Sequence, residues 1–173
     1  DKPLVTRDLL PLGSPGAMDL LYALDDRFQD GVFEPASLAP VARWLGADSV
    51  LLANDLAFDR FRTARPQIVA DEVAGAPSIL PAETFGRIGL NTPDVAMADE
   101  RGLGDPRTSA PLFPVVVHGI DGPGTVVRAS DRTVVVSGSG DGLVDAAAAG
   151  LVDGHEVVRY SASLTDENLV TEL

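Results

Sequence analysis

Apolar positions in the first 75 residues recur at helical spacing and are bounded by helix-capping residues. Ser14, followed by proline, has the pattern of an N-cap, and Gly31 has that of a C-terminal stop. Between them, apolar residues share one helical face: Ala17, Leu20, Leu21, Leu24 and Phe28. The same signals predict helices over residues 35–46 and 66–75, and the short apolar run 49–53 has strand length. Helices and a strand in close succession predict an α/β fold.

The C-terminal third alternates between strand-like and helix-like segments. Runs rich in β-branched residues predict strands over residues 113–117, 125–127, 133–136 and 156–160. An alanine-rich segment, residues 143–152, predicts a helix that ends at Gly154. A strand, a helix and a further strand in this order are typical of a parallel sheet.

Residues 76–111 show no clear periodicity and are interrupted by five prolines. Structureless loops of more than about 15 residues are uncommon in compact domains. We therefore expect an irregular segment laid over the core and pinned there by apolar side chains: Ile79, Leu80, Phe85, Ile88, Leu90 and Met97. The predicted architecture is a single, three-layer-like α/β domain with a mostly parallel sheet. It consists of a helical N-terminal lobe (1–75), the irregular segment (76–111) and a β-rich βαβ lobe (112–173).

Composition excludes several classes of function. The 173 residues contain 13 basic and 26 acidic side chains, a net charge of −13, which disfavours binding to nucleic acid or to anionic lipid. Cysteine is absent, so thiol catalysis and disulfides are excluded. No apolar run approaches the ~20 residues that span a bilayer, so we expect this polypeptide itself not to be membrane-inserted.

The glycine-rich segment 138–142 follows a predicted strand and opens a predicted helix, where phosphate-binding loops occur. The candidate contact residues there are Ser139, Gly140 and Asp141. Its spacing is G-x-G-x-G, whereas the dinucleotide fingerprint is G-x-G-x-x-G, and Asp141 would repel a pyrophosphate. The alternative is a tight structural turn in which Asp141 or Ser139 caps the helix.

No metal, cofactor or catalytic residue is predicted. The two histidines, His118 and His155, have no spacing that favours zinc, and each is expected to be a surface residue at a strand end. No G-x-S-x-G nucleophile elbow occurs. Trp44 lies at helical spacing beside Leu45, which is more typical of a core position than of a sugar platform.

The loop after the strand 49–53 is the candidate for ligand contact, because loops at the carboxyl ends of strands bind ligands in open α/β sheets. It combines aromatic, charged and amide side chains: Asn54, Asp55, Phe58, Arg60, Phe61 and Arg62. Its two phenylalanines could stack on a sugar or fill the core, so a purely structural loop is the alternative.

Several stretches together resemble the soluble region of the mycobacterial-type α-(1→3)-arabinofuranosyltransferases. The likeness covers most of the chain except about 76–111, and no single motif is diagnostic. The stretches that carry it are 1–15, 19–31, 38–43, 54–56, 60–66, 140–150 and 160–164.

The resemblance implies a polytopic cell-envelope enzyme that transfers arabinofuranose from a polyprenyl-phosphate donor onto the arabinan of arabinogalactan and lipoarabinomannan. The family's catalytic acid belongs to its membrane-embedded part, so no catalytic residue is carried over to this chain. The chain is then expected to be an accessory extracytoplasmic (periplasmic) region that is inactive alone and supports acceptor binding or the scaffolding of neighbouring modules. Its expected partners are the remaining modules of the enzyme and the arabinan acceptor. The alternative is a stand-alone small-molecule-binding or hydrolytic α/β domain that uses the loop 138–142.

Overall fold

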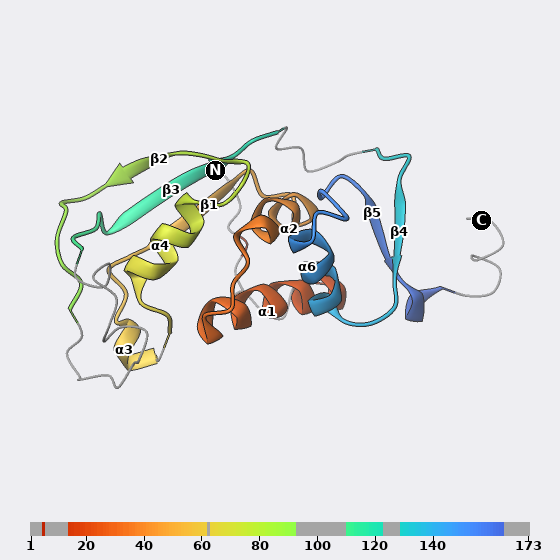
Figure 1. Ribbon diagram of the computed structural model, residues 1–173, viewed down its shortest axis with the longest axis horizontal. Coiled ribbons are helices and arrows are strands. Elements are labelled where there is room, and N and C mark those ends of the chain that lie inside the picture. Colours follow the sequence, from red (N-terminus) through yellow and green to blue (C-terminus); the bar gives the residue numbers. More distant parts are fainter. Residues whose placement is uncertain (1–4, 6–13, 62, 93–109, 123–128, 165–173) are drawn as a thin grey trace.

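The computed structural model describes residues 5, 14–61, 63–92, 110–122 and 129–164 (Figure 1). Its elements, in chain order, are α1 (Pro15–Asp30), η2 (Pro35–Ser37), α2 (Leu38–Trp44), β1 (Ser49–Ala53), α3 (Phe58–Phe61), α4 (Pro66–Ala74), β2 (Ile79–Phe85), β3 (Val115–Ile120), β4 (Thr133–Val136), α6 (Gly140–Ala148), β5 (Val157–Tyr160) and η4 (Ser161–Ser163). A three-stranded sheet lies at one end of the molecule, helices α1, α2 and α6 lie in the middle, and β4 and β5 lie at the other end. Among the described residues, no helix combines the length and the apolar character needed to cross a membrane.

The N-terminal helices form where the sequence predicts them. The Ser14 hydroxyl accepts a hydrogen bond from the Ala17 amide at 3.3 Å, and Gly31 ends α1 in the left-handed conformation with φ 65°. The predicted second helix begins with the 3₁₀ turn η2 and continues as α2, and the third is α4. Strand β1 has the predicted bounds. Capping residues and apolar periodicity agree for these elements, and their prediction is confirmed. The short helix α3 lies within residues that the sequence predicts as a loop.

The strands form one antiparallel and one parallel sheet. The larger sheet has the order β1-β3-β2, and both of its pairings are antiparallel. Among the described strands only β4 and β5 are parallel, with α6 as the connection between them. The predicted mostly parallel sheet is therefore right for the C-terminal unit and wrong for the larger sheet. The strand that pairs with β1 comes more than 60 residues later in the chain, and strand periodicity carries no information on the direction of such a distant partner.

Strand β2 corrects the prediction that residues 76–111 are wholly irregular. It is an edge strand, exposed along almost its whole length, so its side chains do not show the alternation of a half-buried strand. Pro81 lies where its register against β3 shifts, between the pairs of Ile79 and Ala82. Proline is tolerated at such an irregularity of an edge strand, where its missing N–H breaks no regular ladder.

Several other boundaries differ from the predictions. Strand β3 begins two residues later than predicted and extends to Ile120, and α6 begins three residues earlier, at Gly140. Helix α6 also ends at Ala148, before Gly150 with its φ of 70°, and not at Gly154. The predicted strand 125–127 lies outside the described residues.

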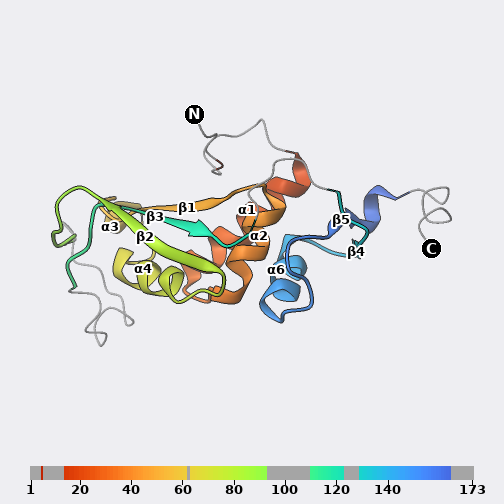
Figure 2. The same cartoon turned by 90° about the horizontal axis from the view of Figure 1, so that it is seen from above.

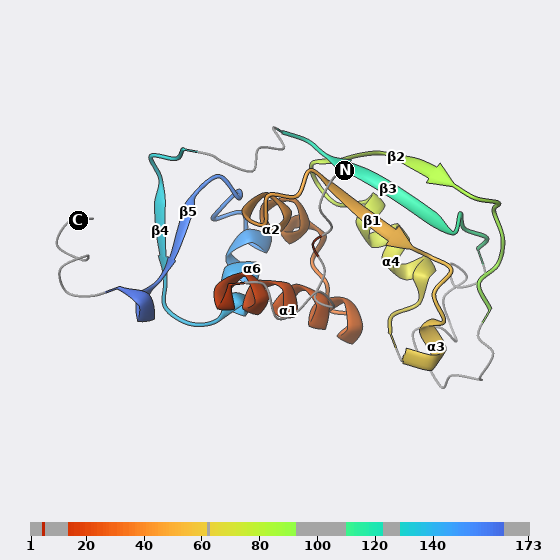
Figure 3. The same cartoon turned by 180° about the vertical axis from the view of Figure 1, so that it is seen from behind.

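The described residues form three clusters of buried apolar side chains, and the two larger ones hold most of these elements together. One core lies between α1, α2 and α6 and consists of the buried residues Leu20, Ala23, Val41, Leu143 and Val144. The other lies under the antiparallel sheet and consists of Phe33, Leu38, Val73 and Ala76, with the β1 residues Val50 and Leu52 packed against it. Figures 1 and 3 show α1 and α6 side by side, and α6 also contacts η2 and α2, so the C-terminal βαβ unit is attached to the N-terminal helices largely through α6.

The crossing of α1 and α6 depends on a glycine. A Cβ atom at Gly140 would lie 2.7 Å from the carbonyl oxygen of Asp19 and 2.9 Å from Cα of Leu20. These neighbours are backbone atoms of α1, which cannot move aside without shifting the helix. A Cβ atom at Gly142, further along α6, would have nothing within 4 Å. The first glycine is therefore a packing requirement and the other is not.

We predict that Gly140→Ala lowers the free energy of unfolding by about 1–3 kcal/mol, because overpacking forces α1 and α6 apart. The matched control is Gly142→Ala, which adds the same methyl group in open space within the same helix. It should leave stability unchanged or raise it by up to about 1 kcal/mol through helix propensity. Urea denaturation followed by circular dichroism measures both variants. Equal free energies of unfolding for the two would contradict the close helix crossing.

Candidate functional site

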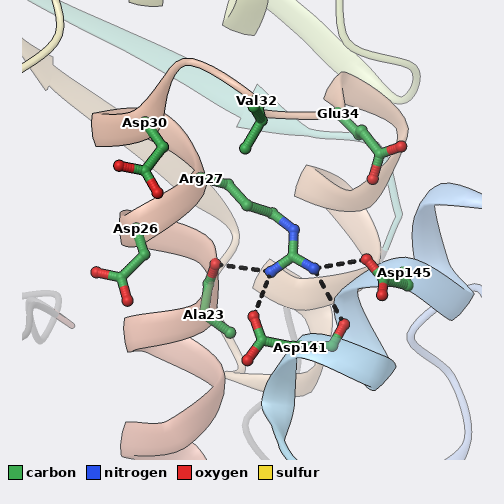
Figure 4. Close-up of a pocket in the computed structure, with 8 residues that line it drawn as sticks. All are labelled: Ala23, Asp26, Arg27, Asp30, Val32, Glu34, Asp141 and Asp145. Atoms are coloured by element: carbon green, nitrogen blue, oxygen red, sulfur yellow. Dashed lines mark hydrogen bonds and ion pairs between the residues drawn. The ribbon is translucent and has the colours of Figure 1, made fainter.

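An acidic hollow on the described surface lies between α1 and α6 (Figure 4). It has a volume of about 520 Å³ and opens widely to solvent. Five carboxylates surround a single arginine, and the lining residues are Ala23, Asp26, Arg27, Asp30, Val32, Glu34, Asp141 and Asp145. Figure 4 shows the Arg27 guanidinium between the two helices, with Asp141 and Asp145 pointing toward it from α6.

Arg27 makes four hydrogen bonds, one within α1 and three that bridge to α6. Its Nη1 donates to the carbonyl of Ala23 at 3.0 Å and to Oδ1 of Asp141 at 2.8 Å. Its Nη2 donates to the carbonyl of Asp141 at 3.2 Å and to Oδ1 of Asp145 at 2.5 Å. Only 13% of the arginine side chain is exposed, whereas both aspartates are mostly exposed. Burial alone would lower the pKa of Arg27, but the hydrogen bonds and charges of Asp145 and Asp141 outweigh burial and raise it above its ordinary value.

This arrangement is suited to holding helices together and poorly suited to anion binding. The donors of the guanidinium are already directed at Asp141, Asp145 and Ala23, and the surrounding carboxylates would repel a phosphate. Within the described ranges, no group of three or more histidine, aspartate or glutamate side chains is arranged to hold a metal ion. The hollow is therefore best explained as the outer side of an ion-paired helix contact.

The glycine-rich loop 138–142 belongs to the same contact. Gly138 has φ 139°, a conformation available to glycine, and the Gly140 amide donates to a carboxylate oxygen of Asp19 on α1. The Ser139 hydroxyl donates to Asp141 at 3.2 Å and makes no cap hydrogen bond to the helix. The amide that would face a bound phosphate is thus already bonded to a carboxylate. These contacts favour a structural turn over a phosphate-binding loop.

Ser139 occupies the predicted N-cap position of α6, but its side chain makes no cap hydrogen bond, and a residue from another helix takes that role. Asp19 accepts the hydrogen bond from the Gly140 amide, where the sequence predicts Ser139 or Asp141 as the cap. Both aspartates near the helix start are instead directed at Arg27. Asp19 and Arg27 lie more than 110 residues from their partners, so only helical spacing on α1 could have indicated that they share a face.

The loop after β1 is held in place by buried polar groups. Asn54 is buried, and its side-chain amide donates to the carbonyl of Phe113 at 3.0 Å. The carbonyl of Asn54 accepts from the side-chain amide of Asn91 at 2.6 Å, and that amide also donates to the carbonyl of Leu56 at 2.9 Å. Asn54 therefore fixes the shape of the loop and has little surface left for a ligand.

The other candidate residues of this loop divide into buried and exposed groups. Phe58 is 2% exposed, and the Arg65 guanidinium lies 5.5 Å from the centroid of its ring, so the ring packs inside the protein. Asp55 and Arg60 are exposed. Phe61 is the last residue of α3, and Arg62 lies outside the described residues. The structure thus leaves Asp55 and Arg60 at the surface as polar groups that a ligand could reach.

A second, smaller hollow of about 260 Å³ lies beside the helix core. Its walls include the aromatic side chains of Trp44 and Tyr160, and Trp44 packs against the core as predicted. The ring of Tyr160 lies against the first turn of α1, where a Cβ atom at Gly16 would be 3.0 Å from it. Burial raises the pKa of Tyr160, and the negative charge of Asp19 raises it further.

The two histidines have different environments. His118 is buried in β3, and its Nδ1 lies 3.2 Å from the carbonyl of Leu80, so the prediction of a surface position is wrong for this residue. His155 is exposed in the turn before β5 and pairs with Asp153 at 3.0 Å. The backbone amide of His155 and, to a lesser extent, its ring and Arg132 lower the pKa of Asp153. This turn packs around Glu156, whose side chain is fully buried and lies 2.6 Å from Arg132.

Comparison with known proteins adds a family to this geometry. A family model described as "Alpha-(1->3)-arabinofuranosyltransferase, N-terminal GT-C domain" matches residues 1–172. The chain is also 33% identical over 100 residues to an α-(1→3)-arabinofuranosyltransferase of Mycolicibacterium smegmatis. Those residues are 57% of this chain and 7% of that relative, so the match spans a small part of the relative's length. No solved structure matches the chain significantly. The first two findings confirm the family that the sequence resembles.

We predict that Arg27→Gln lowers the free energy of unfolding by about 1–2 kcal/mol, because it removes charged hydrogen bonds whose carboxylate partners remain partly hydrated. The control is Asp26→Asn, because Asp26 lines the same hollow and Figure 4 draws no hydrogen bond or ion pair between it and Arg27. The free energy of unfolding of this control should lie within about 0.5 kcal/mol of that of the parent chain. Chemical denaturation at neutral pH tests both. If Arg27→Gln has the same free energy of unfolding as the parent chain, the ion pairs do not stabilise the helix contact.

We predict that Tyr160 loses its proton at a pH above the value of about 10 that is typical of tyrosine. The unfolded chain would then release this proton first, so the free energy of unfolding should fall as the pH rises above about 10. In Tyr22→Phe, Tyr160 is the only tyrosine left, and phenolate absorbance reports its titration directly. In Tyr160→Phe, the alkaline loss of stability should be smaller. A midpoint for Tyr160 at or below the typical value would contradict the buried position of its hydroxyl.

Proposed function

Because the chain belongs to the α-(1→3)-arabinofuranosyltransferase family, we propose that it is an accessory region of such an enzyme, without catalytic activity of its own. In this role it supports the binding of the arabinan acceptor or the scaffolding of neighbouring modules. The observation that carries the proposal is the family match over residues 1–172. It agrees with the described surface, on which Arg27, Asp141 and Asp145 form ion pairs between α1 and α6 and are therefore not free to bind a substrate.

The parent reaction would be the transfer of arabinofuranose onto cell-wall arabinan, in arabinogalactan or lipoarabinomannan. We place the chain on the extracytoplasmic side of the membrane, where such an acceptor glycan would be found. The acidic surface is compatible with this role, since arabinan is neutral and neither attracted nor repelled by a net charge of −13.

We propose the loop that follows β1 as the site of acceptor contact. Sugar hydroxyls are recognised by fixed polar side chains that replace water, and Asp55 and Arg60 present a carboxylate and a guanidinium at the surface. The buried Asn54 holds the backbone between them in a defined shape through its bonds to Phe113 and Asn91. Phe58 supports the loop from inside, so in this conformation stacking on its ring would not contribute.

We predict that arabinan oligosaccharides perturb the backbone amides of residues 54–60 before any others in an NMR titration. The affinity should be on the order of millimolar, about 4 kcal/mol at standard state. Because the ligand is uncharged, the dissociation constant should change little with salt. Asp55→Ala and Arg60→Ala should weaken binding severalfold, whereas Asp131→Ala, an exposed change outside this loop, should not.

A glucan oligosaccharide of equal length serves as the control ligand. Equal perturbation by arabinan and glucan would mean that the loop has no preference for the acceptor. If saturating arabinan shifts no amide resonance of this loop, the acceptor-binding role fails and scaffolding remains as the proposed role.

A further inference from the structure

The antiparallel sheet has one covered face and one open face. On the covered side, Val50, Leu52 and Ile79 pack against the buried residues of the helices. Figure 2 shows α4 and α2 on this side of β1, β3 and β2, and none of the described helices on the other side. Successive side chains of a strand point to opposite faces, so the alternate positions of these strands form the open face.

The register of the strands defines the open face, whose larger side chains are Leu51, Leu80, Glu83, Phe85, Val115 and Val117, with the small residues Ser49, Ala53 and Gly119 on the same side. One row of side chains across the three strands consists of Leu51, Val117 and Glu83. In the neighbouring row, Phe85 lies opposite Val115. Leu80 belongs to the same face, because a Cβ atom at Gly119 would lie 3.2 Å from its Cδ1 atom. The exposed fractions are 54% for Leu51, 44% for Leu80 and 51% for Phe85.

This composition is unusual for the surface of such a charged chain. Glu83 is the single charged residue of the open face, although acidic residues outnumber basic ones by 26 to 13 in the sequence. Exposed protein surfaces commonly carry charged residues at about 25–35% of positions. Large apolar side chains gathered on an otherwise charged protein mark an interaction surface.

We propose that the open face is a docking surface for another segment of the same polypeptide in the longer arabinofuranosyltransferase. The segment would present apolar side chains to Leu51, Leu80 and Phe85, and a basic group to Glu83. This inference rests on the proposed function, in which the chain works as part of a larger enzyme. In the M. smegmatis relative, the 100 matched residues are 7% of the length, so most of that protein lies outside the matched region and includes segments that could take this role.

The size of the open face favours a tethered partner over a separate one. Its three large half-exposed side chains offer roughly 300 Å² of apolar surface, taking about 200 Å² for each side chain. Stable complexes of separate chains bury about 800 Å² on each partner, whereas contacts within one chain can be smaller. A tethered segment needs less area, since its effective concentration reaches the millimolar range. A second copy of this chain would also bring another net charge of −13.

Cysteine reactivity tests this proposal, because the chain has no cysteine of its own. Leu51→Cys and Phe85→Cys place a thiol on the open face, and Leu151→Cys places one at a distant position that is 73% exposed. Each variant is labelled with a maleimide in two forms, the 173-residue chain and the full-length product of its gene. Mass spectrometry of the labelled peptide gives the rate. We expect labelling of the two open-face cysteines to be at least tenfold slower in the full-length product, and that of Leu151→Cys to be unchanged.

Equal rates in the two forms would overturn the proposal, as would a gene product no longer than this chain. Slow labelling of the isolated chain that becomes faster on dilution would identify a second copy as the occupant instead. Protection that appears only in lipid vesicles and not in detergent would identify the bilayer. Both outcomes contradict a tethered protein segment. The arabinan titration is independent, so loss of acceptor binding with retained protection would reject only the acceptor role.

Discussion

The first turn of α6 lies directly against the backbone of α1, and this contact determines how the two halves of the chain are joined. The absence of a side chain at Gly140 allows the approach, the carboxylate of Asp19 takes up the amide that the turn exposes, and Arg27 draws Asp141 and Asp145 toward α1. The three features have different effects: the glycine allows close packing, Asp19 satisfies a backbone N–H group, and Arg27 neutralises the charge of two aspartates. The parallel unit of β4, α6 and β5 is attached to the N-terminal helices through this contact.

This constraint also separates structural charges from those available for function. The glycine-rich loop and the acidic hollow have the composition of ligand sites, yet their donors and acceptors are already matched to each other across the helix pair. The surfaces that remain are of two kinds. One is the polar loop after β1, with Asp55 and Arg60 exposed, and the other is the apolar open face of the sheet. Both are accessible to a ligand or to another protein segment.

Local signals in the sequence were sufficient for α1, α2 and α4, and insufficient for α3, for the bounds of α6, for the sheet and for the site. Ser14 and Gly31 delimit α1 because capping depends on residues three or four positions apart. The edge strand β2 has no buried face to produce alternation, so its seven residues resemble loop sequence. The role of Asp19 and Arg27 depends on contacts across more than 110 residues, which no local pattern encodes. Phe58 could equally have been a sugar platform by composition, and only its burial in the fold decides that its ring is internal.

Native-state hydrogen exchange of the parent chain and of Arg27→Gln tests most directly whether the helix contact joins the two halves. If it does, the amides of α1 and α6, including that of Gly140, open in one cooperative step with a common free energy. Arg27→Gln should then lower the protection of both helices by the same amount. If α6 opens on its own while α1 keeps full protection, the contact is incidental to the stability of the fold, and the role assigned to its ion pairs and glycine is wrong.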